Sequence, residues 1–371
     1  MDTDELRAWL RLLMSPGIGR QQARQLLGAF GSPQAVFAQE ASAWEALGLA
    51  KVLPALAAEP PELAALLERT QAWLAQPDCA VFTLGAPGYP ACLLDIDDPP
   101  LMLFAMGSLV RPWSEAPFSN AHCLAVVGSR NPTPQGELNA RQFAQALAGQ
   151  GICVVSGLAL GIDGAAHAGA LEGGGLTLAV VGTGLDRVYP SRHRALAHRI
   201  AGQGALLSEF PLGTPALAHH FPQRNRLIAG LSRATLVVEA NLQSGSLITA
   251  RLAAEQGKDV LAIPGSIHSP QSRGCHALIH QGARLVTSVQ DVLDELGWLA
   301  PAPVQAAAPA ALGPTPSDLL QALGFEPLPL DALQQRCGWP TERLLAELLE
   351  LELAGQVARL PGGLFQRLVR A

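Results

Sequence analysis

The sequence predicts an α/β fold in which a doubly wound, mainly parallel sheet follows an all-α module and precedes a small C-terminal domain. The central region alternates short apolar runs with helical stretches, a cadence typical of consecutive βα units. Residues 1–75 instead carry apolar side chains at helical spacing, and residues 317–371 indicate three helices and a hairpin. At 371 residues the chain is longer than one hydrophobic core usually becomes, which agrees with several domains.

The strands of the central region are expected to be buried on both faces, because their hydrophobicity is continuous rather than alternating. A Rossmann-like, doubly wound sheet is the arrangement that buries such strands between helices. The expected strands are 123–127, 152–155, 176–181, 205–207, 234–238, 260–263 and 285–287.

The segments on either side of the sheet have distinct signatures. Gly17-Ile18-Gly19 between two short helices is typical of a helix-hairpin-helix, whose turn amides can bind a DNA phosphate, although a SAM-like packing module fits equally well. Three expected helices (319–323, 330–337 and 341–353) and a hairpin (356–360 with 364–368) predict a winged helix. The predicted segments are a helical domain at 1–75, a connecting segment at 76–119, the Rossmann-like domain at 120–299, a Pro/Ala linker at 300–316 and the winged helix at 317–371.

The charge is unevenly divided along the chain. The whole chain is formally −6, which argues against a general nucleic-acid coat protein. Residues 1–119 hold seven cationic and 13 anionic side chains, residues 120–300 hold 13 and 11, and residues 301–371 hold five and seven. The central region is therefore the only net-basic part, whereas the third helix of the winged helix is acidic and suits a protein partner better than DNA.

Targeting, membrane and metal signals are weak. The first residues are acidic rather than basic, and the uncharged run at 142–162 is broken by glycine, so we expect neither a signal peptide nor a membrane span. The six cysteines show no CxxC spacing, and Cys123 and Cys153 lie in apolar strands, which predicts reduced, buried thiols in a cytoplasmic protein. Cys275, His276 and His280 are too few ligands for a closed metal site, and no cofactor is expected.

Glycine-rich and serine-rich turns follow several of the predicted strands. Ligands of open parallel sheets bind beyond the carboxyl ends of the strands, where Gly128-Ser129-Arg130, Ser156-Gly157 and Ser244-Gly245-Ser246 are expected to meet. Glycine lets an anion approach the backbone, the helix that starts after Thr133 offers free N–H groups, and Arg130 adds a phosphate donor. Each turn alone fits ordinary βα turn chemistry, but their convergence favours a site for a polyanion.

The most specific segment surrounds Phe221. Phe221 lies three and five residues before Arg224 and Arg226, with Asn225 between them at the expected start of a helix. A stacking ring beside guanidinium groups is typical of single-stranded nucleic-acid binding. The alternative, in which Phe221 belongs to the core and the arginines form surface ion pairs, remains equally open.

No catalytic motif is evident in the sequence. There is no GxxxxGK phosphate loop, and Glu209 and Glu239 at strand ends have no evident partner, so they are interpreted as structural or as ribose or base contacts.

Taken together, the motifs resemble the DNA-processing protein A family (DprA, also called Smf) over nearly the whole chain. The resemblance rests on the turns above, on Gly161-Ile162-Asp163, Gly182-Thr183-Gly184, Tyr189-Pro190 and Ser208-Glu209, and on Val238-Glu239-Ala240, Pro264-Gly265 and Gly274-Cys275. It departs at Ala218, where some relatives have lysine, and at His276, where many have asparagine.

The resemblance implies a cytoplasmic, non-enzymatic protein that binds and protects incoming single-stranded DNA and helps load the RecA recombinase during natural transformation. It also implies a homodimer formed through the Rossmann-like domain. The residues it places at the DNA are Gly128, Ser129, Arg130, Ser156, Gly157, Phe221, Arg224, Asn225, Arg226, Ser244, Gly245 and Ser246.

Two other functions are weighed against this one. A nucleotide phosphoribohydrolase on a related Rossmann-like scaffold would need a glutamate near its phosphate loop, but no acid follows Ser244 until Glu255. A purely structural adaptor would act through its winged helix.

Overall fold

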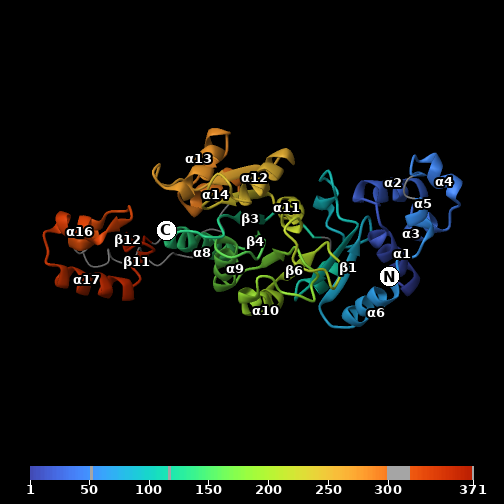
Figure 1. Cartoon of the computed structure of the whole chain (residues 1–371), viewed down its shortest axis with the longest axis horizontal. Coiled ribbons are helices and arrows are strands. Elements are labelled where there is room, and N and C mark those ends of the chain that lie inside the picture. The colour runs from blue at the N-terminus through green and yellow to red at the C-terminus, as the bar shows by residue number, and fades with distance from the viewer. Residues whose placement is uncertain (51–52, 116–117, 299–317, 370–371) are drawn as a thin grey trace.

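The computed structural model describes residues 1–50, 53–115, 118–298 and 318–369 (Figure 1). Six short helices come first, followed by a nine-stranded sheet with helices on both faces, and the C-terminal domain has its own three-stranded sheet. The sheet domain and the C-terminal domain confirm the predicted fold class.

The nine strands run in the order β1-β2-β6-β5-β4-β3-β7-β8-β9, with the last seven parallel and β1 and β2 antiparallel at one edge. All seven strands predicted for the central region are present. The strand bounds are β1 Cys79–Thr83, β2 Met102–Met106, β3 Cys123–Val127, β4 Cys153–Ser156, β5 Thr177–Val180, β6 Ala205–Ser208, β7 Ala234–Val237, β8 Asp259–Ala262 and β9 Arg284–Leu285.

The chain reverses its direction of progress across the sheet at β3. Strands β4, β5 and β6 follow one another outward on one side of β3, whereas β7, β8 and β9 follow one another outward on its other side. Val127 pairs with Val237, so the carboxyl ends of β3 and β7 lie side by side. Such a topological switch point leaves a crevice in which open α/β sheets bind ligands.

Helices cover both faces of the sheet, and neighbouring side chains of its central strands belong to different layers. Val154 belongs to the buried cluster that includes residues of α8, α9 and α14, whereas its neighbour Val155 belongs to the cluster that includes residues of α11, α12 and α13. The helix bounds are α7 Val110–Glu115, α8 Pro134–Gly149, α9 Ile162–Glu172, α10 Arg194–Gln203, α11 His220–Gly230, α12 Ser246–Glu255, α13 Arg273–His280 and α14 Val289–Leu296, with 3₁₀ turns at Ala91–Leu93, Ser191–His193 and Pro270–Ser272.

The N-terminal helices pack directly on the sheet domain. Trp9 and Trp73 share one buried cluster with Phe104 of β2 and Ile200 of α10, so the two parts have a continuous core. The bounds are α1 Thr3–Met14, α2 Arg20–Phe30, α3 Pro33–Phe37, α4 Ala41–Ala46, α5 Leu53–Ala57 and α6 Leu63–Leu74.

The C-terminal domain has the predicted helices and hairpin. Leu319, Leu333, Leu348 and Phe365 belong to a separate buried cluster of this domain. Its elements are α15 Asp318–Leu323, β10 Leu328–Pro329, α16 Leu330–Cys337, α17 Thr341–Leu353, β11 Val357–Leu360 and β12 Leu364–Arg367, with strand order β10-β12-β11. The predicted 300–316 linker lies outside the described residues.

The uncharged run at 142–162 is divided among several elements, as expected. It comprises the end of α8, the strand β4 and the loop before α9. Among the described residues, no helix has both the length and the apolar character needed to cross a bilayer. Cys123 and Cys153 are buried in β3 and β4, as predicted.

Candidate nucleic-acid interface

A pocket of about 760 Å³ lies at the switch point, beyond the carboxyl ends of β3 and β7. Its wall comes from the loops that follow β3, β4, β5, β6, β7 and β8, together with the first turns of α11 and α12. The predicted site residues that line it are Gly128, Ser129, Arg130, Phe221, Arg224, Asn225, Ser244, Gly245 and Ser246.

Arg224 is the buried cation of this pocket. Its side chain is 4% exposed, and one guanidinium nitrogen donates to the carbonyl of Gly157 at 2.9 Å. Asp163 lies 4.0 Å away, and the buried Nε of Arg224 has no hydrogen-bond partner. Burial lowers the pKa of Arg224 to about 10, so the group is still charged at neutral pH. A partly satisfied buried guanidinium on a pocket wall favours an anionic ligand.

Gly157 and Ser156 do not line the pocket but have structural roles in the loop that Arg224 contacts. A Cβ at Gly157 would overlap the Arg224 guanidinium, so only glycine allows the arginine to reach the Gly157 carbonyl. Ser156 is fully buried, and its hydroxyl donates to the carbonyl of Val126 at 2.6 Å. Both residues of this predicted pair therefore hold the loop in place.

Two aromatic rings meet at the rim of the pocket. The ring centroids of Tyr189 and Phe221 are 5.6 Å apart, and the guanidinium carbon of Arg130 lies 5.2 Å from the Phe221 ring. Tyr189 is half-exposed and lines the pocket, although its motif alone gave it no role at the site. An exposed tyrosine and a partly buried phenylalanine beside an arginine are suited to stacking with nucleic-acid bases.

The helix N-termini near the pocket are not equally available to a ligand. Ser244, Gly245 and Ser246 place the start of α12 at the pocket wall. The start of α8 offers fewer free N–H groups than expected, because the Thr133 hydroxyl accepts from the Gly136 amide at 3.0 Å. Glu239 in turn accepts from the Thr133 amide at 2.7 Å and from its hydroxyl at 2.8 Å. Burial raises the pKa of Glu239, which these bonds partly offset. Glu239 is thus a structural cap.

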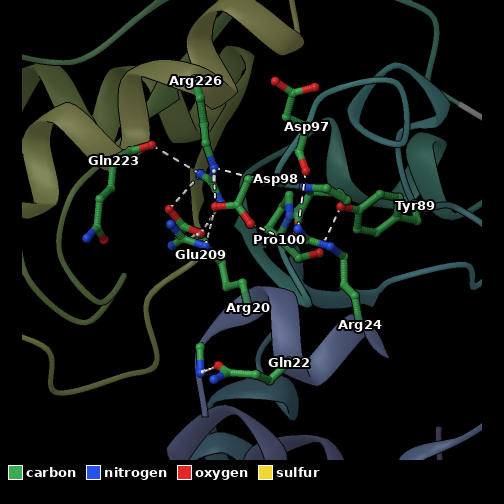
Figure 2. A network of polar contacts seen from close by, with 12 residues as sticks. Arg20, Gln22, Arg24, Tyr89, Asp97, Asp98, Pro100, Glu209, Gln223 and Arg226 are labelled. Carbon is green, nitrogen blue, oxygen red and sulfur yellow. Dashed lines mark hydrogen bonds and ion pairs between the residues drawn. The ribbon is translucent and has the colours of Figure 1, made fainter. Parts of the chain in front are cut away.

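Arg226 lies outside the pocket, in a network of ion pairs shown in Figure 2. Its guanidinium donates to Glu209 at 2.5 and 2.8 Å and to the carbonyl of Asp98 at 2.8 Å. Arg20 and Arg24 of α2 donate to the Asp98 carboxylate at 2.6 and 2.5 Å. Burial raises the pKa of Asp98, but its bond from Arg24 and the charges of Arg20 and Arg226 outweigh this and lower it. The network joins the N-terminal module to α11.

The start of α11 explains the separation of the two arginines. The helix was expected from Asn225 but begins at His220, so Arg224 and Arg226 are both in the helix. Side chains two positions apart in a helix point in nearly opposite directions. One arginine therefore reaches the pocket and the other reaches Glu209.

The hairpin between α1 and α2 uses its amides internally. The Gly19 amide donates to the Gln22 side chain at 2.6 Å, and the Ile18 amide donates to the carbonyl of Ser15 at 3.2 Å. Arg20, the nearest cation, is paired with Asp98 and Glu209. These contacts favour the packing interpretation of the hairpin over phosphate binding.

The family comparisons identify the chain. The model of the family described as DNA recombination-mediator protein A matches residues 80–297, which are more than half of the protein. The chain belongs to the DprA/Smf family. A second model, the DprA winged helix domain, matches residues 301–363.

Relatives of known sequence and structure agree with membership in the DprA/Smf family. Protein Smf of Escherichia coli is 45% identical over 317 residues, which cover 82% of each chain. The structure of DprA from Streptococcus pneumoniae is 36% identical with a TM-score of 0.59, covering 80% of this chain and 98% of that one. A structure of DprA from Helicobacter pylori, described for its single-stranded DNA binding mode, is 29% identical with a TM-score of 0.51, covering 58% of this chain and 95% of that one.

Two departures from the DprA/Smf pattern have local explanations. Ala218 lines the pocket, and His220, two residues later, is buried, stacked on Phe210 and bonded to the carbonyl of Gly182 at 3.1 Å. His220 is therefore held by contacts within the fold. His276 bonds to the carbonyl of Gly265 at 3.0 Å, which joins α13 to the loop after β8. Among the described residues, no group of three His, Cys, Asp or Glu side chains is arranged to hold a metal.

Proposed function

We propose that this protein binds single-stranded DNA at the switch-point pocket and acts as a recombination mediator rather than an enzyme. The observation that carries the proposal is the combination of buried Arg224 with the Tyr189–Phe221 pair in one pocket. The arginine suits a phosphate and the rings suit unpaired bases, which a duplex would keep stacked inside.

The finer role that we propose is protection of incoming DNA and loading of RecA during natural transformation. The protein would act in the cytoplasm as a homodimer formed through the Rossmann-like domain. Membership in the recombination-mediator family supports this role. The reported description of the Helicobacter pylori relative supports single-stranded DNA as the ligand.

The carboxylates around the pocket argue against the phosphoribohydrolase alternative. Glu239 caps α8, and Glu255 lies at the far end of α12, where it is paired with Arg251 at 3.7 Å. Asp163 does line the pocket, but it accepts amide bonds from Gly157 and Ala159 and faces Arg224. These contacts leave no carboxylate poised to activate water among the described residues of the pocket.

Equilibrium binding to labelled oligonucleotides tests the proposal. Fluorescence anisotropy should show tighter binding to a single strand than to the matching duplex at the same salt concentration. Equal or tighter binding to the duplex would contradict it. The proposed RecA loading is tested separately. RecA filaments should form faster on single strands that are already coated with a single-strand-binding protein when this protein is added than when it is left out.

A further inference from the structure

Helix α17 of the C-terminal domain has two apolar faces. Leu344, Leu348 and Leu351 are buried in the core of this domain. Leu345, Leu349 and Leu353 recur every four residues on the other side, and they are 45%, 56% and 82% exposed. We call Leu345, Leu349 and Leu353 the leucine row.

The leucine row differs from the usual surface of a helix. A helix that packs by one face normally presents polar side chains on the other. Single exposed leucines are ordinary, but residues four apart are neighbours on a helix, so the row forms one continuous apolar strip. Contiguous apolar strips on a folded surface mark interaction sites.

Exposed carboxylates border the leucine row. By helical periodicity Glu342 is in line with the row at its N-terminal end, while Glu350 and Glu352 lie on either side of it. The one cation of this helix, Arg343, lies on the Glu350 side of the row, two turns before Glu350, and its guanidinium carbon is 4.0 Å from the centre of the Trp339 ring. Three carboxylates against this one cation leave the strip apolar along its middle and mainly negative along its edges.

We propose that the leucine row binds an amphipathic helix of another protein, with apolar side chains along its middle and lysine or arginine at its edges. A second helix packs on such a strip by fitting its side chains into the grooves between the leucines. Basic residues at its edges would face Glu342, Glu350 and Glu352, as in coiled coils that select partners by flanking charge. The proposal does not depend on the DNA pocket.

The charges disfavour the other possible occupants. Two copies of α17 packed through their leucine rows would bring the glutamate borders of both helices together. Single-stranded DNA would place phosphates beside the same carboxylates. A basic helix is the occupant that both the leucines and the glutamates attract.

A pair of synthetic helical peptides tests the proposal on the full-length protein. Both peptides carry leucines four residues apart, and they differ only in having lysine or glutamate at the flanking positions. Anisotropy should show binding of the lysine peptide at least about tenfold tighter than binding of the glutamate peptide. Equal binding of the two peptides would overturn the proposal.

Variants separate the leucine row from plain charge attraction. Leu349→Ser with Leu353→Ser keeps every charge and changes only exposed side chains, so it should fold and bind the lysine peptide at least about tenfold more weakly. Leu94→Ser, at a leucine 49% exposed elsewhere, is the control and should bind normally. Unchanged affinity in the double variant would show that peptide binding depends on charge alone, and this result would overturn the proposal.

Two further measurements address the competing occupants. Sedimentation velocity should give the same oligomeric state for the double variant and the unmodified protein, and a loss of oligomer would make the leucine row a self-interface. Single-stranded DNA affinity should also be unchanged in the double variant. A fall in that affinity would assign α17 to DNA and would contradict the proposal, whereas failure of the peptide test leaves the pocket unaffected.

Discussion

At the scale of single residues, the pocket depends on a buried cation that the fold holds in place without fully satisfying it. Arg224 bonds to the Gly157 carbonyl and faces Asp163 at 4.0 Å, and its Nε remains without a partner. Arg224 lines the pocket, so its charged guanidinium can attract an anionic ligand there. The glycine at 157 is essential to this arrangement, because any side chain there would displace the guanidinium.

Phe221→Ala should weaken single-stranded DNA binding by about 1–3 kcal/mol, because one base would lose its stacking partner. The salt dependence of binding should change little, since no phosphate contact is removed. Anisotropy titrations at several salt concentrations measure both quantities, and Phe221→Tyr, which keeps a ring, serves as the control. If Phe221→Ala instead lowers the melting temperature and leaves the affinity of the folded protein intact, Phe221 is a core residue.

Nine of the twelve site residues predicted from the sequence line the pocket. Gly128, Arg130 and Ser244 follow predicted strands, and the carboxyl ends of parallel strands must share one edge. Tyr189 was not assigned to the site, because its approach to Phe221 is a tertiary contact between residues 32 positions apart in the sequence. Arg226 was placed at the DNA by the family resemblance, whereas in the structure it is bonded to Glu209 and to the Asp98 carbonyl outside the pocket.

At the scale of elements, α11 connects the pocket with the N-terminal module. Arg224 points to the pocket, while Arg226 on the other side binds Glu209 and Asp98 (Figure 2). The two arginines should therefore have separable effects on DNA binding and on stability.

Arg226→Ala should lower the free energy of unfolding by about 3–5 kcal/mol, because it leaves Glu209 buried with a weaker partner. The salt dependence of DNA binding by the folded protein should be unchanged. Urea unfolding gives the first quantity and anisotropy the second. A double-mutant cycle with Glu209→Ala isolates the pair, and a coupling energy near zero would contradict the assignment.

Element pairing is also where prediction from sequence was weakest. Residues 76–119 were predicted as a connecting segment that leads into the core, and they contain β1 and β2, which extend the sheet beyond β6 in the antiparallel direction. The pairing of Phe104 with Ser208 joins residues far apart in the sequence, which periodicity cannot reveal. The contact of Glu239 with the start of α8 was not predicted for the same reason, because it joins residues far apart in the sequence.

At the scale of the whole molecule, the formal charge of −6 gives no indication of the local cationic site formed by Arg130 and Arg224 in the pocket. Some of the acidity is neutralised by internal pairs, as at Asp98 and Glu209, and the acidic α17 belongs to a domain with its own core. The total charge therefore predicts weak non-specific attraction to DNA, and the proposed binding depends on the charge of the pocket alone.

Deleting residues 301–371 should leave most of the affinity for single-stranded DNA intact. The C-terminal domain has a separate core, and among the described residues none of those that line the pocket comes from this domain. Anisotropy on the shortened and full-length proteins measures the difference, and melting curves verify that the shortened protein is folded. A large loss of affinity in a folded deletion variant would show that the winged helix contacts DNA.

The salt dependence of single-stranded DNA binding by pocket variants tests the central claim most directly. Arg130 is exposed, so Arg130→Ala should fold normally, and Arg224→Ala is compared with it after its fold has been verified. Each variant should bind more weakly, with the slope of log affinity against log salt reduced by about 0.7 per lost phosphate contact. Arg194→Ala, at an exposed arginine of α10 away from the pocket, should match the unmodified protein. Unchanged affinity and slope in both Arg130→Ala and Arg224→Ala would show that the DNA binds elsewhere.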